Sequence, residues 1–168
     1  MPDLIVPNER LHRAWLQAHA EWGAGLHEDG FGLLATDEVD SPAGFHTWLA
    51  RLADESGCCT YWWIVENDQI LGGIALRHQN HELVAQAGHI GYGIRPSLRG
   101  HGLATWALGQ VVDEARALGM DRVMVICEAG NSASAKTIER QCGILEVGRD
   151  TNSGAARRYW ITISQPEN

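Results

Sequence analysis

The chain of 168 residues contains no uninterrupted stretch of 18 apolar residues, and its N-terminus has no basic segment followed by an apolar one. We therefore expect neither a membrane-spanning helix nor an export signal. The four cysteines include no C-x-x-C spacing, and the adjacent Cys58 and Cys59 are poorly placed to pair with each other. Reduced thiols, and hence a cytoplasmic protein, are expected.

Basic residues are also scarce: 13 lysines and arginines stand against 21 acids, so the formal charge is -8. This balance repels phosphate groups and argues against nucleic acid or an anionic membrane as a partner, whereas a cationic partner fits better. Hydrophobic residues at 45% and charged residues at 20% are typical of a globular domain. The length suits one core, so we expect a single domain over residues 1–168.

The hydrophobic pattern is helical near the N-terminus and then changes to strands. Apolar residues recur every three or four positions between residues 11 and 22, and the pattern restarts after Ser41 and Pro42, which are typical of a helix start. Residues 61–65 and 69–76, separated by a short polar turn, predict a β-hairpin.

From residue 89 onward, strands and helices alternate, which is typical of a parallel βα arrangement. The expected elements are a strand over 89–94, a helix over 103–118, a strand over 122–127, a helix over 131–141, and strands over 145–149 and 157–163. The sequence thus predicts an α/β fold with a mixed sheet, consisting of N-terminal helices, a central hairpin and a βαβαββ C-terminal half.

The segment between the predicted strand at 89–94 and the helix at 103–118 carries the strongest functional signal. Gly100 and Gly102 let consecutive backbone N–H groups turn toward an anion at a helix N-terminus, where the helix dipole favours a phosphate. The Gly-Lys-Ser/Thr ending of a Walker loop is absent, and the three-glycine spacing of a dinucleotide fingerprint is incomplete. A plain glycine turn into a helix is the simpler alternative.

The segment from Arg99 to Ala104 reads Arg-x-x-Gly-x-Ala, follows the strand-like residues 91–96, and precedes by two elements an Asn-led segment at 131–138. Together the three segments resemble the GNAT superfamily, the acyl-CoA-dependent N-acetyltransferases, whose pyrophosphate motif is Gln/Arg-x-x-Gly-x-Gly/Ala. The resemblance extends over residues 61–143. The chain also looks like an uncharacterised bacterial branch of predicted acetyltransferases.

The resemblance implies that acetyl-CoA enters a cleft between two splayed parallel strands, here the one that ends at Ile94 and the one at 122–127. Backbone amides after the first strand would hold the pyrophosphate, the amide of Ile94 or a neighbour would polarise the thioester carbonyl, and Asn131 with Ser134 would face the pantetheine and sulfur. No metal is expected. The implied cofactor-binding residues are Ile94, Arg99, Gly100, His101, Gly102, Leu103, Ala104, Asn131 and Ser134.

Acetyl transfer to an amine needs a base that deprotonates the ammonium and a proton for the leaving thiolate, but no covalent nucleophile. His89 is the leading base, because counting back from Arg99 reaches the strand where family members carry such a group, and its ordinary pKa is about 6.5. Glu128, just beyond the partner strand, is the competing base. A buried strand histidine and a solvent-facing carboxylate are the simpler interpretations of these two residues.

The general acid is the departure from the family pattern. The tyrosine that many members carry on the Asn-led helix is replaced here by Ile138. Tyr92 or Tyr159 is the candidate replacement, unless the thiolate leaves unprotonated. Cys142 lies near the end of that helix, but an ordinary free cysteine explains it better than a covalent intermediate.

Most of the negative charge is concentrated between residues 28 and 55, where seven acids stand against one base. Because the first helices and their loop usually shape the acceptor pocket in this superfamily, we expect a cationic amine held by Glu28 and Asp29, with Trp22 stacked on it. A solvated acidic loop is the alternative.

The sequence therefore predicts an N-acetyltransferase that moves an acetyl group from acetyl-CoA directly to a primary amine of a small cationic acceptor in a ternary complex. Two alternatives stay open. One is a protein or peptide N-terminal acetyltransferase, and the other is a non-catalytic acyl-CoA-binding sensor, which the missing helix tyrosine favours. A homodimer is compatible with the sequence, which does not decide the oligomeric state.

Overall fold

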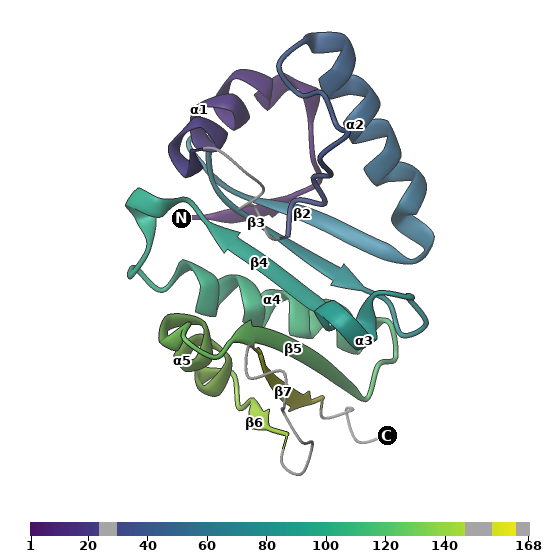
Figure 1. Ribbon diagram of the computed structural model, residues 1–168, viewed down its shortest axis with the longest axis vertical. Helices are drawn as coiled ribbons and strands as arrows, with labels where there is room; N and C mark the ends of the chain where they lie inside the picture. The colour runs from purple at the N-terminus through teal and green to yellow at the C-terminus, as the bar shows by residue number, and fades with distance from the viewer. Residues whose placement is uncertain (24–29, 147–155, 164–168) are drawn as a thin grey trace.

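The computed structural model describes residues 1–23, 30–146 and 156–163, which form a seven-stranded sheet with helices on both of its faces (Figure 1). The strands are β1 (Asp3–Ile5), β2 (Cys59–Glu66), β3 (Gln69–Arg77), β4 (Ile90–Ile94), β5 (Arg122–Glu128), β6 (Ile144–Leu145) and β7 (Ala156–Thr162). The α-helices are α1 (His12–Trp22), α2 (Pro42–Asp54), α3 (Val84–Ala87), α4 (Leu103–Ala117) and α5 (Ser132–Arg140), and the 3-10 turns are η1 (Glu9–Leu11), η2 (Glu55–Gly57) and η3 (Pro96–Leu98).

The strand order is β1-β2-β3-β4-β5-β7-β6, and the sheet is mixed. β4 and β5 run parallel, and the other neighbouring pairs are antiparallel. The α/β class, the hairpin and the parallel pair predicted from the sequence are confirmed. The predicted strand at 145–149 is seen as the two residues of β6, and residues 147–155 lie outside the described part of the chain.

Local sequence explains where these elements begin and turn. Asn67 (φ 51°) and Asp68 (φ 59°) both adopt the left-handed conformation that a two-residue hairpin turn requires, and they join β2 to β3. Ser41 caps α2 by accepting the Gly44 N–H at 3.0 Å, with Pro42 in the first turn.

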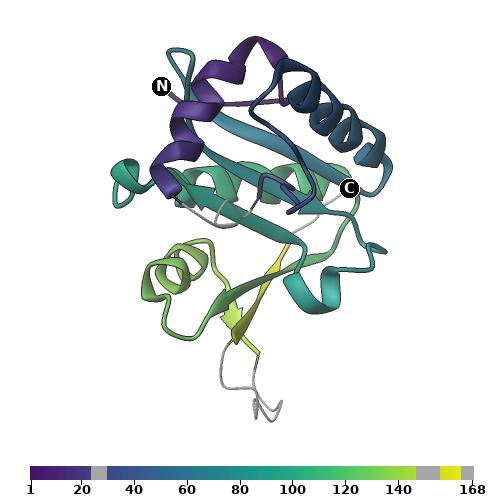
Figure 2. The same cartoon turned by 45° about the horizontal axis from the view of Figure 1, so that its top comes forward.

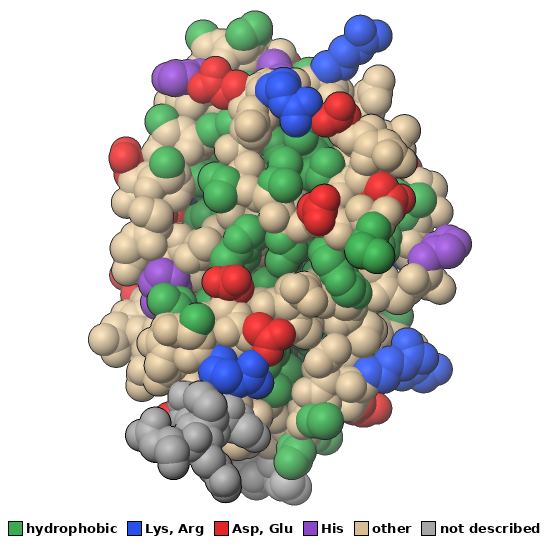
Figure 3. Space-filling model, turned by 180° about the vertical axis from the view of Figure 1, so that it is seen from behind, with side chains coloured by type: hydrophobic (Ala, Val, Ile, Leu, Met, Phe, Trp, Pro, Cys, Tyr) green, Lys and Arg blue, Asp and Glu red, His purple; other side chains and the backbone are tan. Residues whose placement is uncertain are grey.

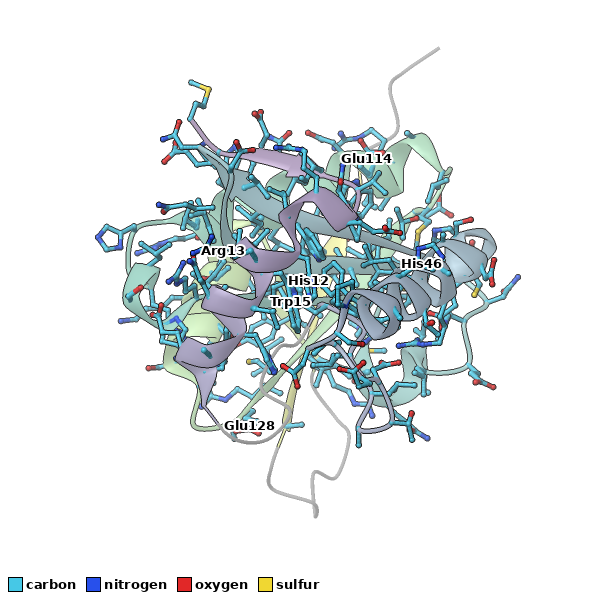
Figure 4. All side chains as sticks on the ribbon, turned by 90° about the horizontal axis from the view of Figure 1, so that it is seen from above. His12, Arg13, Trp15, His46, Glu114 and Glu128 are labelled. Atoms are coloured by element: carbon cyan, nitrogen blue, oxygen red, sulfur yellow. The ribbon has the colours of Figure 1, made fainter. Side chains whose placement is uncertain are left out.

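One hydrophobic core lies between the sheet and the helices α1 and α2. Trp15 of α1 and Trp48 of α2 have ring centroids 4.8 Å apart, and Trp63 of β2 lies 6.2 Å beyond Trp48. All three indoles are buried, and such aromatic pairs contribute about 0.5–1.5 kcal/mol beyond their buried area. In Figure 4, His12 and Trp15 lie between the two helices, where the His12 ring stacks on Phe45 at 4.0 Å.

The second core lies on the opposite face, where α4 packs on the sheet. Ala107, Leu108 and Val111 of α4 are fully buried against Ile74 and Val125 of the strands. Figure 2 shows α1 and α2 in front of the β1–β4 part of the sheet and α4 behind it, while the short helix α3 lies against β5. The sheet is therefore covered unevenly, because α1 and α2 do not extend over its β5–β7 half.

Candidate active site

A cavity of about 990 Å³ lies between β4 and β5, bounded by the turn that precedes α4 and by the first turns of α5. The register of the two parallel strands consists of Ile90 opposite Val125. Beyond that pair the strands diverge, because Gly91 to Ile94 on one side and Ile126 to Glu128 on the other line the cavity instead of pairing. Figure 1 shows η3 and α5 at the same end of these two strands. The predicted splay between parallel strands is present.

The backbone of β4 has its polar groups directed toward the cavity at alternate residues. The Arg77 N–H donates to His89 O at 2.6 Å and the Arg95 N–H donates to Leu71 O at 2.8 Å, so the odd-numbered residues pair with β3. In an antiparallel ladder the residues between them point their N–H and C=O groups the other way. The amide of Ile94 is therefore directed toward β5, as an oxyanion contact requires.

The turn before α4 is shaped by two glycines. Gly100 (φ 81°) and Gly102 (φ 80°) are left-handed, and Gly102 is the N-cap residue of α4, so the first amides of this helix have no capping side chain. A Cβ at either glycine meets no atom within 4 Å, so the conformation of the backbone, and not lack of space, requires glycine. Exposed helix-terminal amides on a cavity wall form an anion site.

Arg99 turns back onto the sheet. Its Nε donates to Ile94 O at 3.1 Å, at the end of β4, while its residue lines the cavity. His101 is exposed, pairs through Nδ1 with Leu98 O at 3.1 Å, and does not line the cavity. Of the nine predicted cofactor-binding residues, the structure brings eight to the cavity wall: Ile94, Arg99, Gly100, Gly102, Leu103, Ala104, Asn131 and Ser134.

Asn131 is predicted to face the cofactor, and its side chain also has a structural role. Its Oδ1 accepts the Ser134 N–H at 3.1 Å and caps α5. The cap fixes the first turn of α5 against the end of β5, where both residues line the cavity together with Glu128. Glu128 is thus the acid that the structure brings to the site, and Figure 4 places it at the edge of the molecule away from Glu114 of α4.

His89 does not line the cavity, and its imidazole is used in the sheet. His89 is 5% exposed, and its ring Nδ1 accepts the Met124 N–H at 2.8 Å. The backbone N–H of His89 donates to Met124 O at 2.7 Å. Burial, and then the charges of Arg122 and Arg77, lower the pKa of His89, so the neutral ring is favoured. The prediction that His89 is the base has no geometric support, because the acceptor nitrogen is directed to a backbone amide.

The tyrosine candidates differ in the same way. Tyr92 lines the cavity and packs on the core beside α4. Tyr159 is buried, donates to Glu139 Oε1 at 3.2 Å and lies outside the lining, so it does not face the site. Ile138 is fully buried in the core, and Cys142 is exposed and also outside the cavity.

The acceptor residues predicted from the sequence fall on the connection between α1 and α2. Glu28 and Asp29 lie outside the described residues. Trp22 packs edge-on against Phe31, with ring centroids 5.8 Å apart, and does not line the cavity. Gly30 is the first described residue after this gap. A Cβ there would lie 2.7 Å from Gly91 O, so Gly30 packs closely on β4 beside the cavity.

The acids near this connection have structural partners. Arg51 Nη2 and Asp37 Oδ2 are 2.6 Å apart, and Arg51 Nη1 donates to Glu55 Oε1 at 2.8 Å. Glu38 accepts the Ser41 N–H at 2.9 Å and its hydroxyl, which lowers the pKa of Glu38. The clustering of acids between 28 and 55 therefore has a structural explanation for these three residues, and none of them lines the cavity.

Sequence reasoning missed several residues of the cavity wall. Lys136 and Arg140 of α5 line it, and so do Thr137 and Cys127, whose thiol pKa is raised by burial. The four-residue spacing of Lys136 and Arg140 places them on one helix face, which is the signal that the sequence offered. Two cations beside the exposed amides before α4 complement the phosphates of a nucleotide.

Within residues 1–23, 30–146 and 156–163, no group of three or more His, Cys, Asp or Glu side chains is arranged to hold a metal ion. The Nε2 atom of His78 forms a hydrogen bond with Thr60 Oγ1 at 2.9 Å. No helix in the described ranges has both the length and the apolar character needed to cross a bilayer.

The model of the acetyltransferase (GNAT) domain family matches residues 36–143. The chain belongs to the GNAT acetyltransferases. It is therefore an acyl-CoA-dependent N-acetyltransferase with acetyl-CoA as its cosubstrate, as the sequence predicted.

Solved structures share the GNAT fold over almost the whole chain. RimL, a ribosomal L7/L12 α-N-protein acetyltransferase in complex with coenzyme A, is 19% identical with a TM-score of 0.73, and 96% of this chain aligns with 94% of it. A ribosomal-protein-S5-alanine acetyltransferase from Vibrio fischeri is 15% identical with a TM-score of 0.74, over 99% and 96%. The microcin C7 self-immunity acetyltransferase MccE, in complex with acetyl-CoA and AMP, is 18% identical with a TM-score of 0.67, over 96% and 92%. Among curated protein sequences, none matches this GNAT chain.

Proposed function

We propose that this GNAT enzyme binds acetyl-CoA with the pyrophosphate on the backbone amides of residues 99–104 and the thioester where β4 and β5 diverge. The observation that carries the proposal is the shared cavity. It is lined by the glycine turn that follows β4 and by Glu128 and Ser134, which follow β5. One cavity thus offers amides for a cofactor phosphate and polar side chains for a reacting thioester.

The reaction is a direct transfer. The lone pair of the acceptor amine attacks the thioester carbonyl carbon, the new C–N bond forms, and the C–S bond breaks to release the CoA thiolate. The N–H of Ile94, directed toward β5, stabilises the negative charge on the carbonyl oxygen. No side chain needs to carry the acetyl group.

Glu128 is the base in this proposal. Its carboxylate lies on the cavity wall, so it can take a proton from the acceptor ammonium directly or through a water molecule. His89 is not assigned this role, because its Nδ1 accepts the Met124 N–H and His89 does not line the cavity. The two assignments make opposite predictions for variants at positions 128 and 89.

Ser134 donates a hydrogen bond to the leaving thiolate, whose proton comes from the attacking nitrogen, which becomes acidic once the new C–N bond has formed. The Ser134 hydroxyl stands on the first turn of α5, in the wall of the cavity, whereas Ile138, where the family tyrosine is expected, is buried. Tyr92 is the second donor on the wall. A thiolate is a modest base, so loss of its donor lowers the rate less than loss of the base does.

The acceptor is the primary amine of a polypeptide N-terminus. The full-length likeness to two ribosomal-protein acetyltransferases supports this choice. A small cationic amine is the second candidate, favoured by the chain charge of -8. The structural pairing of Asp37, Glu38 and Glu55 weakens that argument.

Thiol release from acetyl-CoA, measured against a panel of N-terminal peptides, polyamines and aminoglycosides, tests the proposal. Turnover with intersecting initial-rate lines is expected for a ternary complex, and a ping-pong pattern would contradict direct transfer. Glu128→Gln is expected to lower kcat about 100-fold or more, with an unchanged affinity for CoA. Calorimetric CoA binding without turnover of any amine would favour the sensor.

A further inference from the structure

One face of the β5–β7 pair is partly open: Arg122 is exposed, Arg158 and Trp160 are half-buried, and Met124 is buried. Residues directly opposite in an antiparallel ladder share a face, and here Met124 lies opposite Trp160 and Ile126 lies opposite Arg158. Their neighbours Val123 and Val125 point the other way into the core against α4. In Figure 2 neither α1 nor α2 extends over this face, and the short helix α3 contacts β5.

This face leads into the catalytic cavity. Ile126, Glu128 and Ala156 continue it toward the end of β5, and all three line the cavity. The turn before α4 follows β4, on the other side of the cavity from β5. A chain lying along the β5–β7 face therefore reaches Glu128 without crossing the region that holds the cofactor phosphates.

Three arginines gather on and beside this face. The Arg122 guanidinium lies over the Trp160 ring, 4.0 Å from its centroid, and Arg158 Nη1 donates to Met124 Sδ at 3.9 Å. Arg77 Nη1 donates to Gly88 O at 3.3 Å, and the charges of Arg77 and Arg122 both act on His89 between them. We call Arg77, Arg122, Arg158 and Trp160 the arginine face.

These cations lack acidic partners among the described side chains. Arg10, Arg51, Arg95 and Arg116 each form an ion pair in this acidic protein. The three arginines of the arginine face form none within the described ranges. Three acids lie near this face: Asp121, next to Arg122 in the chain, Glu128, which lines the cavity, and Glu146, which accepts the Trp160 Nε1–H at 3.5 Å.

On the face shown in Figure 3, Lys and Arg side chains are scattered around the rim, with single acids between hydrophobic side chains in the middle. In a chain of charge -8, an anionic segment is repelled by most of the surface. Guanidinium groups without acidic partners, beside the cavity, attract such an anionic segment locally.

We propose that the arginine face docks an acidic stretch of the acceptor polypeptide, a few residues after the N-terminal amine that enters the cavity. This inference rests on the proposed transfer to a polypeptide amine and adds the charge of the acceptor. Carboxylates pair with Arg122 and Arg158, and the Trp160 ring packs on the peptide backbone. The contact is exposed to solvent, so it raises association and weakens with salt.

Two synthetic peptides test the docking. Both begin with a serine and a short neutral spacer, and one continues with four glutamates while the other continues with four lysines. The wild-type enzyme is expected to acetylate the glutamate peptide with a KM at least about tenfold lower, and added salt narrows the difference. In the variant Arg122→Glu/Arg158→Glu the preference disappears or reverses, while the KM for acetyl-CoA is unchanged. Arg10→Glu, a charge reversal at a remote surface ion pair, leaves the preference intact.

Binding distinguishes the docking from the proposed acceptor class. If neither peptide is acetylated but the glutamate peptide binds the wild type about tenfold more tightly than the double variant by calorimetry, the docking stands and the polypeptide amine is the wrong acceptor. If both peptides are acetylated equally, or bind the double variant and the wild type equally, the docking is overturned. A change of oligomeric state in the double variant, measured by sedimentation, also overturns it, because the face is then a contact between copies of this chain.

Discussion

His89 and Met124 join β4 to β5 by two hydrogen bonds at the place where these parallel strands separate. The His89 N–H donates to Met124 O at 2.7 Å, and the Met124 N–H donates to His89 Nδ1 at 2.8 Å. The imidazole thus takes the place of a backbone carbonyl. The adjoining Gly88 (φ 76°) allows the approach, because a Cβ there would lie 2.7 Å from Met124 O. The pairing of β4 with β5 ends near these two hydrogen bonds, and the cavity begins beyond them.

Replacing His89 tests how much its hydrogen bonds to Met124 contribute. His89→Ala leaves the Met124 N–H without its acceptor, which is expected to cost about 1–3 kcal/mol of stability and to raise the KM for acetyl-CoA. His89→Asn supplies an oxygen near the position of Nδ1 and is expected to recover most of both. Urea unfolding and initial rates measure the effects. A loss of kcat alone, equal in the two variants, would return His89 to the role of base.

The contribution of His89 to the stability of the fold also depends on pH. Burial and the charges of Arg122 and Arg77 lower the pKa of His89 below its usual 6.5. Its contribution to stability is therefore complete above pH 6.5 and is lost as the pH falls through the lower folded value, because the unfolded chain binds the proton more readily. Unfolding free energies measured between pH 8 and pH 5, on the wild type and His89→Asn, are expected to converge toward the acid end.

Gly102 provides a test of the anion site with a matched control. Its φ of 80° is costly for any other residue, by about 1–2 kcal/mol, although a Cβ meets no atom within 4 Å. Gly102→Val is expected to shift the turn and weaken CoA binding about tenfold or more. Gly119, at the other end of α4, has a φ of 76° and equally open surroundings, so Gly119→Val carries the same strain away from the cavity. Equal CoA affinity in the two variants would contradict the phosphate assignment.

The sequence predicted the parts of the site that depend on backbone conformation. The spacing of Gly100 and Gly102 between a strand and a helix indicated the anion turn, and Asn131 indicated the start of α5. It did not predict the roles that depend on where a side chain points. Counting residues put His89 near the reacting atoms, but the imidazole is directed across to Met124. Lys136 was missed because the pattern of a helix does not show which face borders a cavity.

The charge pattern was an incomplete signal for a related physical reason. Seven acids against one base suggested a cationic pocket, yet composition does not record which acids are already paired. Asp37 and Glu55 both contact Arg51, and Glu38 caps the turn at Ser41. Conversely, Arg122 looked unremarkable in the sequence and lies on the arginine face beside Trp160.

Glu21 links the end of α1 to the turn that precedes the anion site. Its carboxylate accepts the Ser97 N–H at 2.5 Å and a bond from Arg95 Nε. The bonds from Ser97 and then from Arg95 lower its pKa from 4.5 to about 2. Its stabilising contribution is complete above pH 4.5 and is lost as the pH falls through about 2. Glu21→Gln is expected to raise the KM for acetyl-CoA several-fold at pH 7 and to flatten acid unfolding curves between pH 5 and pH 2. An unchanged KM would separate α1 from the cofactor turn.

Lys136 and Arg140 are expected to let the enzyme distinguish CoA from dephospho-CoA, which lacks the 3′-phosphate. Both line the cavity on one face of α5, and neither forms an ion pair among the described residues, so their charges are available to a phosphate. Lys136→Glu/Arg140→Glu is expected to weaken CoA about tenfold or more and dephospho-CoA by clearly less, because the lost attraction acts on the phosphate that only CoA carries. Arg116→Glu, on the neighbouring helix and beside Asp113, serves as the charge-matched control. Calorimetric titration of both nucleotides at two salt concentrations measures the difference. An equal loss for the two nucleotides would assign the pair to the pyrophosphate, and no loss for either would remove α5 from phosphate binding.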